Sequence, residues 1–278
     1  MNTCIFPPSK PIYKRVVAIP SSNFSNLPEP ARTFHIALLA RALAIFRVEE
    51  VAIYRHEGVS CTHIEDVLKA LETPQYLRKK LTPLKPQLKY VGLVPPLAIP
   101  SHQLKGEDYQ YREGLVVAKH GDILIIDIGL ERPIRLKGSL NMGERVTVKK
   151  EGDIWRIVDP DSIEVYWGFR IKCFPDLRSL IDYYRSFLII AASRKGVPLT
   201  TQILSSIIGN LSSMGASGVL FLFGSWKKGL HEIAREEGLE LASISNYILN
   251  TIQCQGTRTV RTEEAVLATL SIFNIIIG

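Results

Sequence analysis

The sequence predicts an α/β protein in which a parallel sheet with flanking helices is interrupted by a small inserted β-barrel. Near both ends of the chain, short apolar runs alternate with helical patterns, which is typical of βαβ units. Three of these runs are followed by polar stretches that contain glycine. Between the two parts, five short β segments follow one another, separated by glycine-bearing turns. Such a series is typical of a small barrel.

The N-terminal part reads as a βαβ unit. Residues 14–20 and 51–54 are expected strands, and residues 29–46 between them have the apolar spacing of an amphipathic helix. The expected buried face of that helix holds five apolar residues, namely Phe34, Leu38, Leu39, Leu43 and Phe46. Because such crossovers are right-handed, the two strands should be parallel. A second helix is expected over residues 62–72, where Thr62 and Glu65 match a capping box, and a third over residues 76–81.

A change of composition at Thr82 marks the start of an insertion. Prolines at positions 83, 86, 95, 96 and 100 end the helical periodicity, and the five β segments then fill residues 112–163. We predict an OB-like barrel, which often binds single-stranded nucleic acid; the alternative is a β insertion of purely structural use. Residues 1–90 and 164–278 are predicted to form the α/β domain, and residues 91–163 to form the inserted barrel. A strand is expected around residues 163–171, where the chain returns to the α/β domain.

Composition and charge narrow the class of protein. With 46% hydrophobic and 22% charged residues the chain is typical of soluble globular proteins, and its apolar runs are too short to cross a membrane. We expect a cytoplasmic protein, because the N-terminus lacks the pattern of a signal peptide. The net charge of +7 favours polyanionic partners, and cations of the insert are candidate RNA contacts. These candidates are Arg132, Arg135 and Lys137.

The four cysteines give no sign of a metal site or of a disulfide framework. Cys4, Cys61, Cys173 and Cys254 are scattered, without a CxxC pair or a nearby histidine at ligand spacing. Buried, reduced thiols are therefore the expected state, and no metal is predicted.

Three strand-loop units in the C-terminal part predict a ligand site. The strands over residues 187–192 and 218–223 are followed by SRKG and FGSWKKG, and the strand that begins at Asn246 leads into NTIQCQGTRTVRTEE. In a parallel sheet such loops gather at one edge, where backbone N–H groups and a helix start face a ligand. Gly256 would let the backbone approach that ligand closely. The alternative is an ordinary strand-to-helix turn with a well-capped helix.

The run NTIQCQGTRTVRTEEA, residues 250–265, resembles the signature of the SPOUT RNA methyltransferases, in the archaeal and eukaryotic branch with an inserted OB-like domain. The resemblance implies an α/β trefoil knot, a homodimer with the helix end at Ile272 and Phe273 near its interface, and S-adenosylmethionine as cofactor. The residues that the resemblance implies for cofactor binding are Leu222, Phe223, Gly224, Ser225, Gly229, Asn250, Thr251, Ile252, Gly256 and Thr257.

The segment 250–265 and the neighbouring loop SRKG also contain catalytic and RNA-binding candidates. Arg258, Arg261 and Glu264 are expected near the reacting centre, where an arginine can stabilise developing negative charge; an Arg261–Glu264 salt bridge is the structural alternative. Arg194 and Lys195, in the neighbouring loop, are expected to contact RNA phosphates.

The sequence thus predicts an S-adenosylmethionine-dependent RNA methyltransferase that acts on ribosomal or transfer RNA, at a pyrimidine base nitrogen. The alternative hypothesis is a non-catalytic RNA-binding or ribosome-assembly factor. Several departures from the family pattern keep it open: Trp226 replaces a usual proline, Ala192 a threonine, and Gln253-Cys254 a Pro-Asn or Pro-Gly pair.

Overall fold

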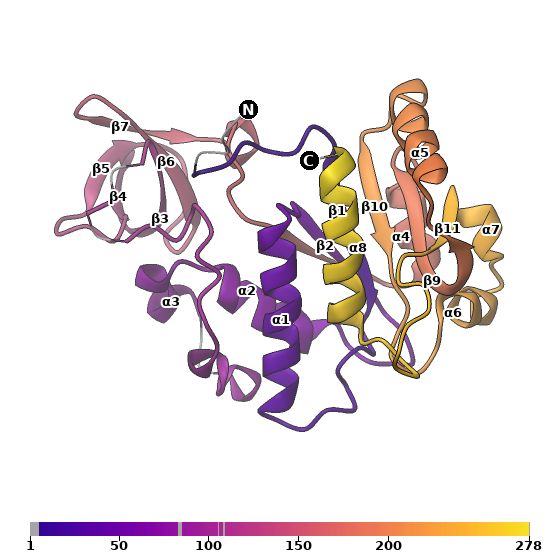
Figure 1. Ribbon diagram of the computed structural model, residues 1–278. Coiled ribbons are helices and arrows are strands. Elements are labelled where there is room, and N and C mark those ends of the chain that lie inside the picture. The colour runs from indigo at the N-terminus through magenta and orange to yellow at the C-terminus, as the bar shows by residue number, and fades with distance from the viewer. Residues whose placement is uncertain (1–5, 83–84, 105, 108, 278) are drawn as a thin grey trace.

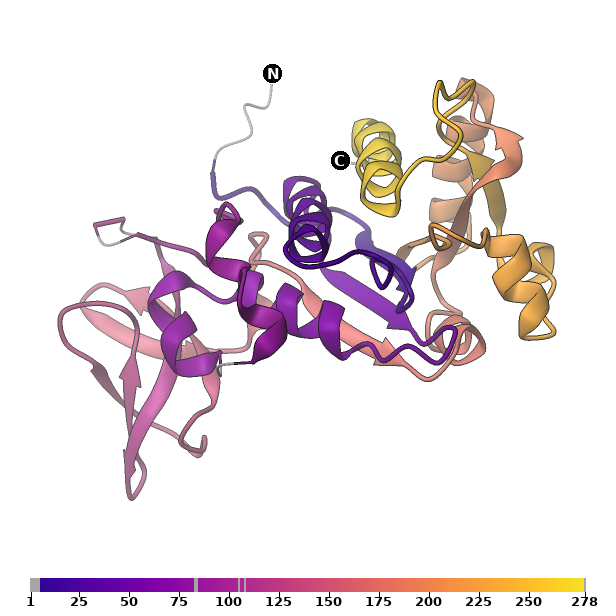
Figure 2. The ribbon, with the colours of Figure 1, turned by 90° about the horizontal axis from the view of Figure 1, so that it is seen from below.

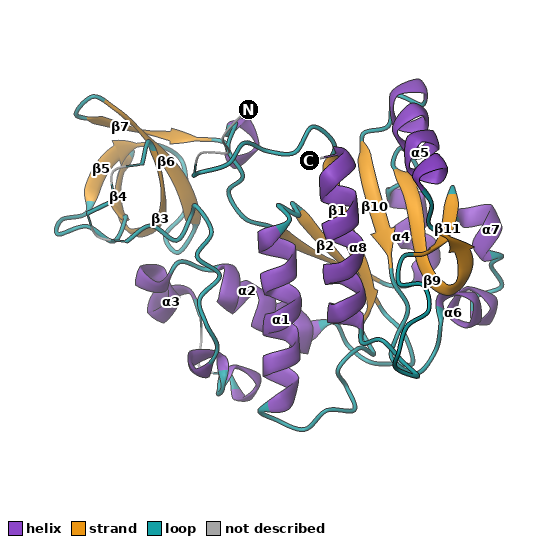
Figure 3. Cartoon of the chain, viewed as in Figure 1, coloured by secondary structure: helices purple, strands orange, loops and turns teal. Residues whose placement is uncertain are grey.

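Two separate sheets organise the chain in the computed structural model, which describes residues 1–278 except 1–5, 83–84, 105, 108 and 278 (Figure 3). The larger sheet has six parallel strands in the order β11-β9-β10-β1-β2-β8. Its strands are β1 (Lys14–Pro20), β2 (Glu50–Tyr54), β8 (Arg170–Phe174), β9 (Leu188–Pro198), β10 (Gly218–Leu222) and β11 (Tyr247–Asn250). Strand β1 lies at the centre, so both ends of the sequence contribute to one core.

Helices cover both faces of this sheet. On one face lie α1 (Ala31–Ile45), α2 (Thr62–Glu72), α5 (Thr201–Ser213) and α8 (Thr262–Ile277), packed on side chains such as Val17 and Phe221. On the other lie α4 (Leu177–Tyr183), α6 (Leu230–Glu236) and α7 (Leu241–Ile244), packed on Val16 and Leu220. Because Val16 and Val17 are both fully buried, β1 faces apolar layers on either side, as parallel strands do. Figures 1 and 2 show α1 and α8 side by side.

Helix α1 buries two residues of the face that its apolar spacing predicts, Leu39 and Leu43, but leaves others of that face exposed. Phe34 and Leu38 are 44% and 54% exposed, whereas Ile36, Leu39 and Leu43 are fully buried. The buried face also carries Ala37, Ala40, Ala42 and Ala44. These small side chains let α1 pack closely against the sheet, α2 and α8 at once.

The predicted capping box of α2 is wrong. Thr62 is the first residue of α2 rather than its cap, and the hydroxyl of Ser60 accepts the backbone N–H of Thr62 at 3.2 Å. Glu65 pairs instead with Lys69, one turn further along, at 2.6 Å. At the end of α8, Phe273 is buried against Phe221 with ring centroids 5.0 Å apart.

The strand β9 is longer than predicted. It continues through the expected loop SRKG to Pro198, because β11 pairs with this extension at Leu249↔Val197 and Asn250↔Pro198 after a register shift. Gly196 is required at this crossing, since a Cβ there would lie 2.6 Å from the carbonyl carbon of Leu249. The predicted strand around residues 163–171 is also wrong for most of its length, because β8 begins only at Arg170.

The smaller sheet is antiparallel, with five strands in the order β5-β4-β3-β6-β7. The strands are β3 (Tyr111–His120), β4 (Ile123–Asp127), β5 (Ile134–Lys137), β6 (Arg145–Glu151) and β7 (Ile154–Val158). The edge strands β5 and β7 also contact each other, so the sheet curls into a nearly closed, OB-like barrel around Val116, Leu124 and Ile126. Short helical pieces connect the two sheets, namely α3 (Gln75–Leu81), η1 (Pro86–Leu88), η2 (Val91–Leu93) and η3 (Pro160–Ser162).

A buried ion cluster joins the barrel to α2. The guanidinium of Arg145 on β6 pairs with Glu72 on α2 and with Glu113 on β3, each at 2.5 Å. Glu113 also accepts hydrogen bonds from Thr147 and from the indole of Trp167. Burial raises the pKa of Glu72, and Arg145 opposes that rise. Although burial disfavours its charge, the two carboxylates hold the pKa of Arg145 above its usual value.

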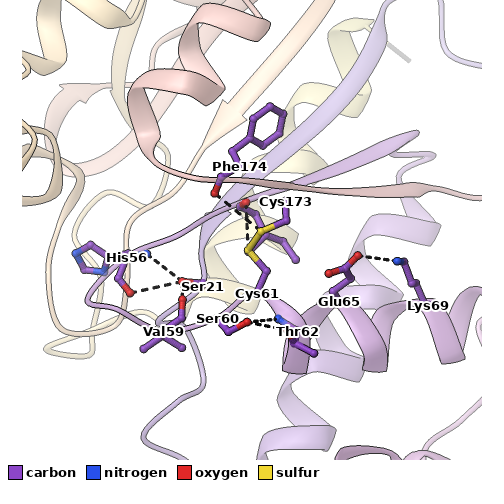
Figure 4. The surroundings of a disulfide bond; sticks show 11 residues. Ser21, His56, Val59, Ser60, Cys61, Thr62, Glu65, Lys69, Cys173 and Phe174 are labelled. Atoms are coloured by element: carbon purple, nitrogen blue, oxygen red, sulfur yellow. Dashed lines mark hydrogen bonds and ion pairs between the residues drawn. A yellow bond between two sulfur atoms is a disulfide. The ribbon is translucent and has the colours of Figure 1, made fainter. Parts of the chain in front are cut away.

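Cys61 and Cys173 form a disulfide, which corrects the expectation of reduced thiols (Figure 4). Cys61 precedes α2 and Cys173 lies on β8, which pairs with β2; this pairing brings residues 112 positions apart to a Cα distance of 6.2 Å. Cys254 is free and exposed, not buried. Within the described part of the chain, no helix is long and apolar enough to cross a membrane, and no group of three or more potential metal ligands occurs.

Candidate active site

A cleft of about 290 Å³ opens where β9, β10 and β11 end, at the carboxyl edge of the larger sheet. Its walls come from the extension of β9, the loop between β10 and α6, and the loop between β11 and α8. Ligands of open α/β sheets bind at this edge. The lining includes an apolar group (Phe223, Leu230, Ile252, Val260 and Ala265) and a cationic group (Arg194, Lys195, Lys227 and Arg258).

The loop after β10 is a tight turn held by its own backbone. The N–H of Ser225 donates to the carbonyl of Lys228 at 2.9 Å, and the Ser225 hydroxyl accepts the N–H of Lys228 at the same distance. Gly224 is needed here, since a Cβ would lie 2.9 Å from the backbone nitrogen of Leu230. Trp226 is 48% exposed at the rim of the cleft.

The ammonium of Lys228 is turned toward two carboxylates. It lies 2.6 Å from Glu236 and 3.0 Å from Glu57. Hydrogen bonding to these groups raises the pKa of Lys228, and the same bonds lower the pKa of Glu57 and Glu236. Lys227, the neighbouring cation, is the one that lines the cleft.

The loop after β11 is fastened to β9 and to the end of β1. The side chain of Asn250 accepts the N–H of Ile252 at 3.1 Å and donates to the carbonyl of Arg194 at 3.3 Å. Arg194 in turn donates to the carbonyl of Arg258 at 2.9 Å. Asn23, just after β1, accepts the hydroxyl of Thr262 at 3.0 Å and donates to the carbonyl of Gly224 at 3.4 Å. These bonds fix all three walls relative to one another.

Most residues implied for cofactor binding line this cleft: Phe223, Gly224, Ser225, Gly229, Asn250, Thr251 and Ile252. Leu222 does not, because it is fully buried in the core beneath. Gly256 and Thr257 are exposed and lie outside the lining set. A Cβ on Gly256 would meet no protein atom within 4 Å.

The predicted catalytic residues are divided by the structure. Arg258 lines the cleft, but Arg261 and Glu264 do not. The guanidinium of Arg261 donates to the Nε2 atom of His35 at 2.9 Å, and the Nδ1 atom of His35 is paired with Glu263 at 2.5 Å. Glu264 accepts the backbone N–H of Arg261 at 2.8 Å, so it caps α8 instead of pairing with the Arg261 side chain.

The predicted RNA contacts lie in two places. Arg194 and Lys195 line the cleft. Arg132, Arg135 and Lys137 are exposed on and before β5 of the barrel, at the opposite end of the molecule from β11 (Figure 1).

The sequence interpretation missed His231 and Glu232, which open α6 and line the cleft. The Nε2 atom of His231 is buried without a hydrogen-bond partner among the described residues. The signal was available, because only Leu230 separates His231 from the glycine-bearing loop FGSWKKG.

The donor set fits S-adenosylmethionine. Its adenosyl group needs apolar contacts, which Phe223, Ile252 and Val260 offer, and its carboxylate needs a cation, which Lys195, Lys227 or Arg258 can supply. When bound, this cofactor supplies an electrophilic methyl group. The chain's own contribution is to hold and orient the reactants in a cleft whose walls are fixed to one another.

The fold and the cleft define an α/β enzyme that binds a small cofactor at the carboxyl ends of its strands. A family model described as "Putative RNA methyltransferase" matches residues 14–273, and the chain belongs to this family. The predicted enzyme class, an RNA methyltransferase, and S-adenosylmethionine as methyl donor are thereby confirmed. The predicted fold class, a parallel α/β domain with an inserted OB-like barrel, is confirmed as well.

Several relatives cover most of the chain. The human 28S rRNA (uridine-N(3))-methyltransferase is 29% identical over 93% of this chain and 77% of its own length. The mouse protein of the same name is 28% identical over 93% and 75%. An uncharacterized protein of Halobacterium salinarum is 30% identical over 92% of this chain and 97% of its own. A SpoU methyltransferase structure, AviRb from Streptomyces viridochromogenes, aligns at 7% identity over 97% of this chain and 60% of that one, with a TM-score of 0.40.

Proposed function

We propose that this chain methylates N3 of a uridine in the RNA of the large ribosomal subunit. The cleft carries the proposal, because it combines apolar walls for the adenosyl group with cations at its rim for RNA phosphates. The human and mouse relatives, whose names specify uridine N3 of 28S rRNA, support this choice over transfer RNA.

The barrel is proposed as a second RNA contact. On the edge strand β5, Arg135 and Lys137 are exposed and alternate with Ile134 and Leu136, which pack on the barrel core. Arg132, in the turn before β5, is exposed as well. The row of cations supports binding to phosphates rather than to base edges, so it anchors the RNA without reading its sequence.

A homodimer is proposed on the exposed apolar side chains of α1 and α8. Phe34, Leu38 and Ile45 are 44%, 54% and 54% exposed on one side of α1. On α8, which packs against α1, Leu267 and Ile275 are 46% and 84% exposed. Apolar side chains gathered in this way on neighbouring elements are typical of a protein–protein interface. Cytoplasmic localisation stays a prediction from the sequence.

Methylation of purified RNA tests the proposed reaction. The protein is incubated with labelled S-adenosylmethionine and either ribosomal or transfer RNA, and the digested nucleosides are separated by mass spectrometry. We expect N3-methyluridine from large-subunit RNA alone. Label in transfer RNA or at another atom would overturn the substrate, and a protein that binds cofactor and RNA without transferring label would favour the non-catalytic RNA-binding factor.

The role of the barrel has its own test. Reversing charge with Arg135→Glu and Lys137→Glu should weaken RNA binding and lower the slope of log affinity against log salt by about 1–2, as expected for two phosphate contacts. Arg235→Glu, on exposed α6 and outside the cleft lining, is the control for a general change in net charge. Equal affinities for the double variant and the wild type would assign the barrel a structural role.

A further inference from the structure

Methylation of a uridine at N3 requires that the proton on N3 be removed. The following inference concerns the group that accepts this proton, and it rests on the proposed function. The N3 atom of uracil carries a hydrogen, and the nitrogen lone pair becomes available for a new bond only as that hydrogen leaves. A positioned side chain that accepts such a proton typically accelerates a reaction by about 10²–10⁴-fold. The cleft should therefore contain a group able to accept a proton at neutral pH.

Most charged side chains of the cleft cannot play this part. The cations that line it come from the β9 extension, the loop before α6 and the loop before α8, and they are Arg194, Lys195, Lys227 and Arg258. Protonated arginine and lysine are donors without acceptor capacity. Two other titratable residues line the cleft, and both open α6: His231 and Glu232.

Glu232 is already engaged by the protein. Its carboxylate accepts the backbone N–H of Gly229 at 3.2 Å and lies 3.9 Å from the ammonium of Lys195. The first contact closes the N-terminal turn of α6, and the second holds a cation of the rim. Proton uptake by Glu232 would weaken both interactions.

His231 is differently placed. Neither nitrogen of its ring has a hydrogen-bond partner among the described residues, and Nε2 is buried from solvent. A buried polar atom without a partner is costly, typically about 1–3 kcal/mol, and a ligand bound in the cleft can supply the missing partner. Neutral imidazole has one nitrogen with a free lone pair, and histidine is the side chain best suited to exchange protons near neutral pH.

We propose that His231 is the general base of the methyl transfer. One ring nitrogen accepts the N3 proton as the N3–carbon bond forms; the sulfur–methyl bond breaks, and its electron pair stays on sulfur. The imidazole ends the step as an imidazolium, which releases its proton to solvent before the next turnover. Atoms and charge balance, because the positive charge of the methyl donor is replaced by that of the imidazolium.

Single-turnover methylation of the RNA identified above separates this role from a structural one. His231→Gln should slow methyl transfer by roughly 100-fold or more while leaving cofactor affinity unchanged in calorimetric titration. Its rate should then rise about tenfold per pH unit, because hydroxide must ionise N3 in place of the imidazole. Arg235→Gln, on the outer side of the same helix and outside the cleft lining, should stay active.

A second readout does not depend on turnover. Carbon-13 labelled histidine rings are followed by NMR, with the His231 signal assigned by its loss in His231→Gln. Adding S-adenosylhomocysteine and a uridine-containing RNA should move that signal and leave the signal of His63, on α2, in place. An unmoved His231 signal, or a His231→Gln variant as active as the wild type, would overturn the inference alone. A wild-type protein that methylates no RNA would overturn the proposed function and the inference with it.

Discussion

Removing the Cys61–Cys173 disulfide should cost the protein a large part of its stability. The bridge closes a loop of 112 residues that contains the whole barrel, residues 111–158. In the chain-entropy account, releasing a loop of that length from the denatured state costs about 5 kcal/mol, and native disulfides typically contribute about 2–5 kcal/mol when removed. We therefore expect the Cys61→Ala, Cys173→Ala variant to lose about 2–5 kcal/mol of unfolding free energy.

Guanidinium denaturation with and without a reductant measures this effect. The oxidised wild type should unfold at a higher midpoint than the double variant, and adding dithiothreitol should bring the wild type down to it. The denaturant slope should be steeper without the bridge, because the unlinked denatured chain exposes more surface. Cys254→Ala is the matched control: Cys254 is free and exposed, so that variant should keep the full response to reductant. Identical midpoints and slopes before and after reduction would refute the reasoning.

Three further predictions concern a buried histidine, the ion cluster that joins the barrel to α2, and the proposed dimer. Burial lowers the pKa of His102 from 6.5 to about 4, because the folded state disfavours the protonated ring. The free energy of unfolding should therefore be highest above pH 6.5 and fall by roughly 3 kcal/mol as the pH drops toward 4. Urea titrations at several pH values should show a smaller fall for His102→Gln. Arg145→Met leaves Glu72 and Glu113 buried without their cation and should lower the unfolding free energy by about 3–5 kcal/mol, with unchanged stability as the contrary result. Leu38→Glu should convert a dimer into a folded monomer in sedimentation experiments, whereas a monomeric wild type would contradict the proposed interface.

The fold was predictable where a pattern depends on neighbours in sequence. Apolar runs identified the central strands, and the regular turns of the insert identified all five barrel strands. The inward face of α1 was only partly predictable: Leu39 and Leu43 are buried as expected, but Phe34 and Leu38 are exposed and alanines fill much of the buried face. The extension of β9 through Arg194 and Lys195 was also not predictable, because its polar residues resemble a loop in sequence. Only the pairing with β11 makes this segment a strand.

The candidate site was predictable as a place but not as a set of side chains. The three strand-loop units do meet in one cleft, as parallel strands require. Which loop residues face it depends on turns and hydrogen bonds, so Gly256 and Arg261 lie outside it while His231 lies within it. The disulfide carried no local signal, because only the pairing of β8 with β2 brings its two cysteines together.

The central position of β1 has a consequence for how the protein is made. Among the strands of the larger sheet β1 is synthesised first, yet one of its two neighbours, β10, follows some two hundred residues later, and α8, which packs on α1, follows later still. The early strand must therefore wait with an unpaired edge, a state that chaperones commonly protect. A chain cut short before residue 262 lacks part of the cleft wall as well as a core helix. Truncated copies should consequently be cleared by proteolysis instead of persisting as partially active enzymes.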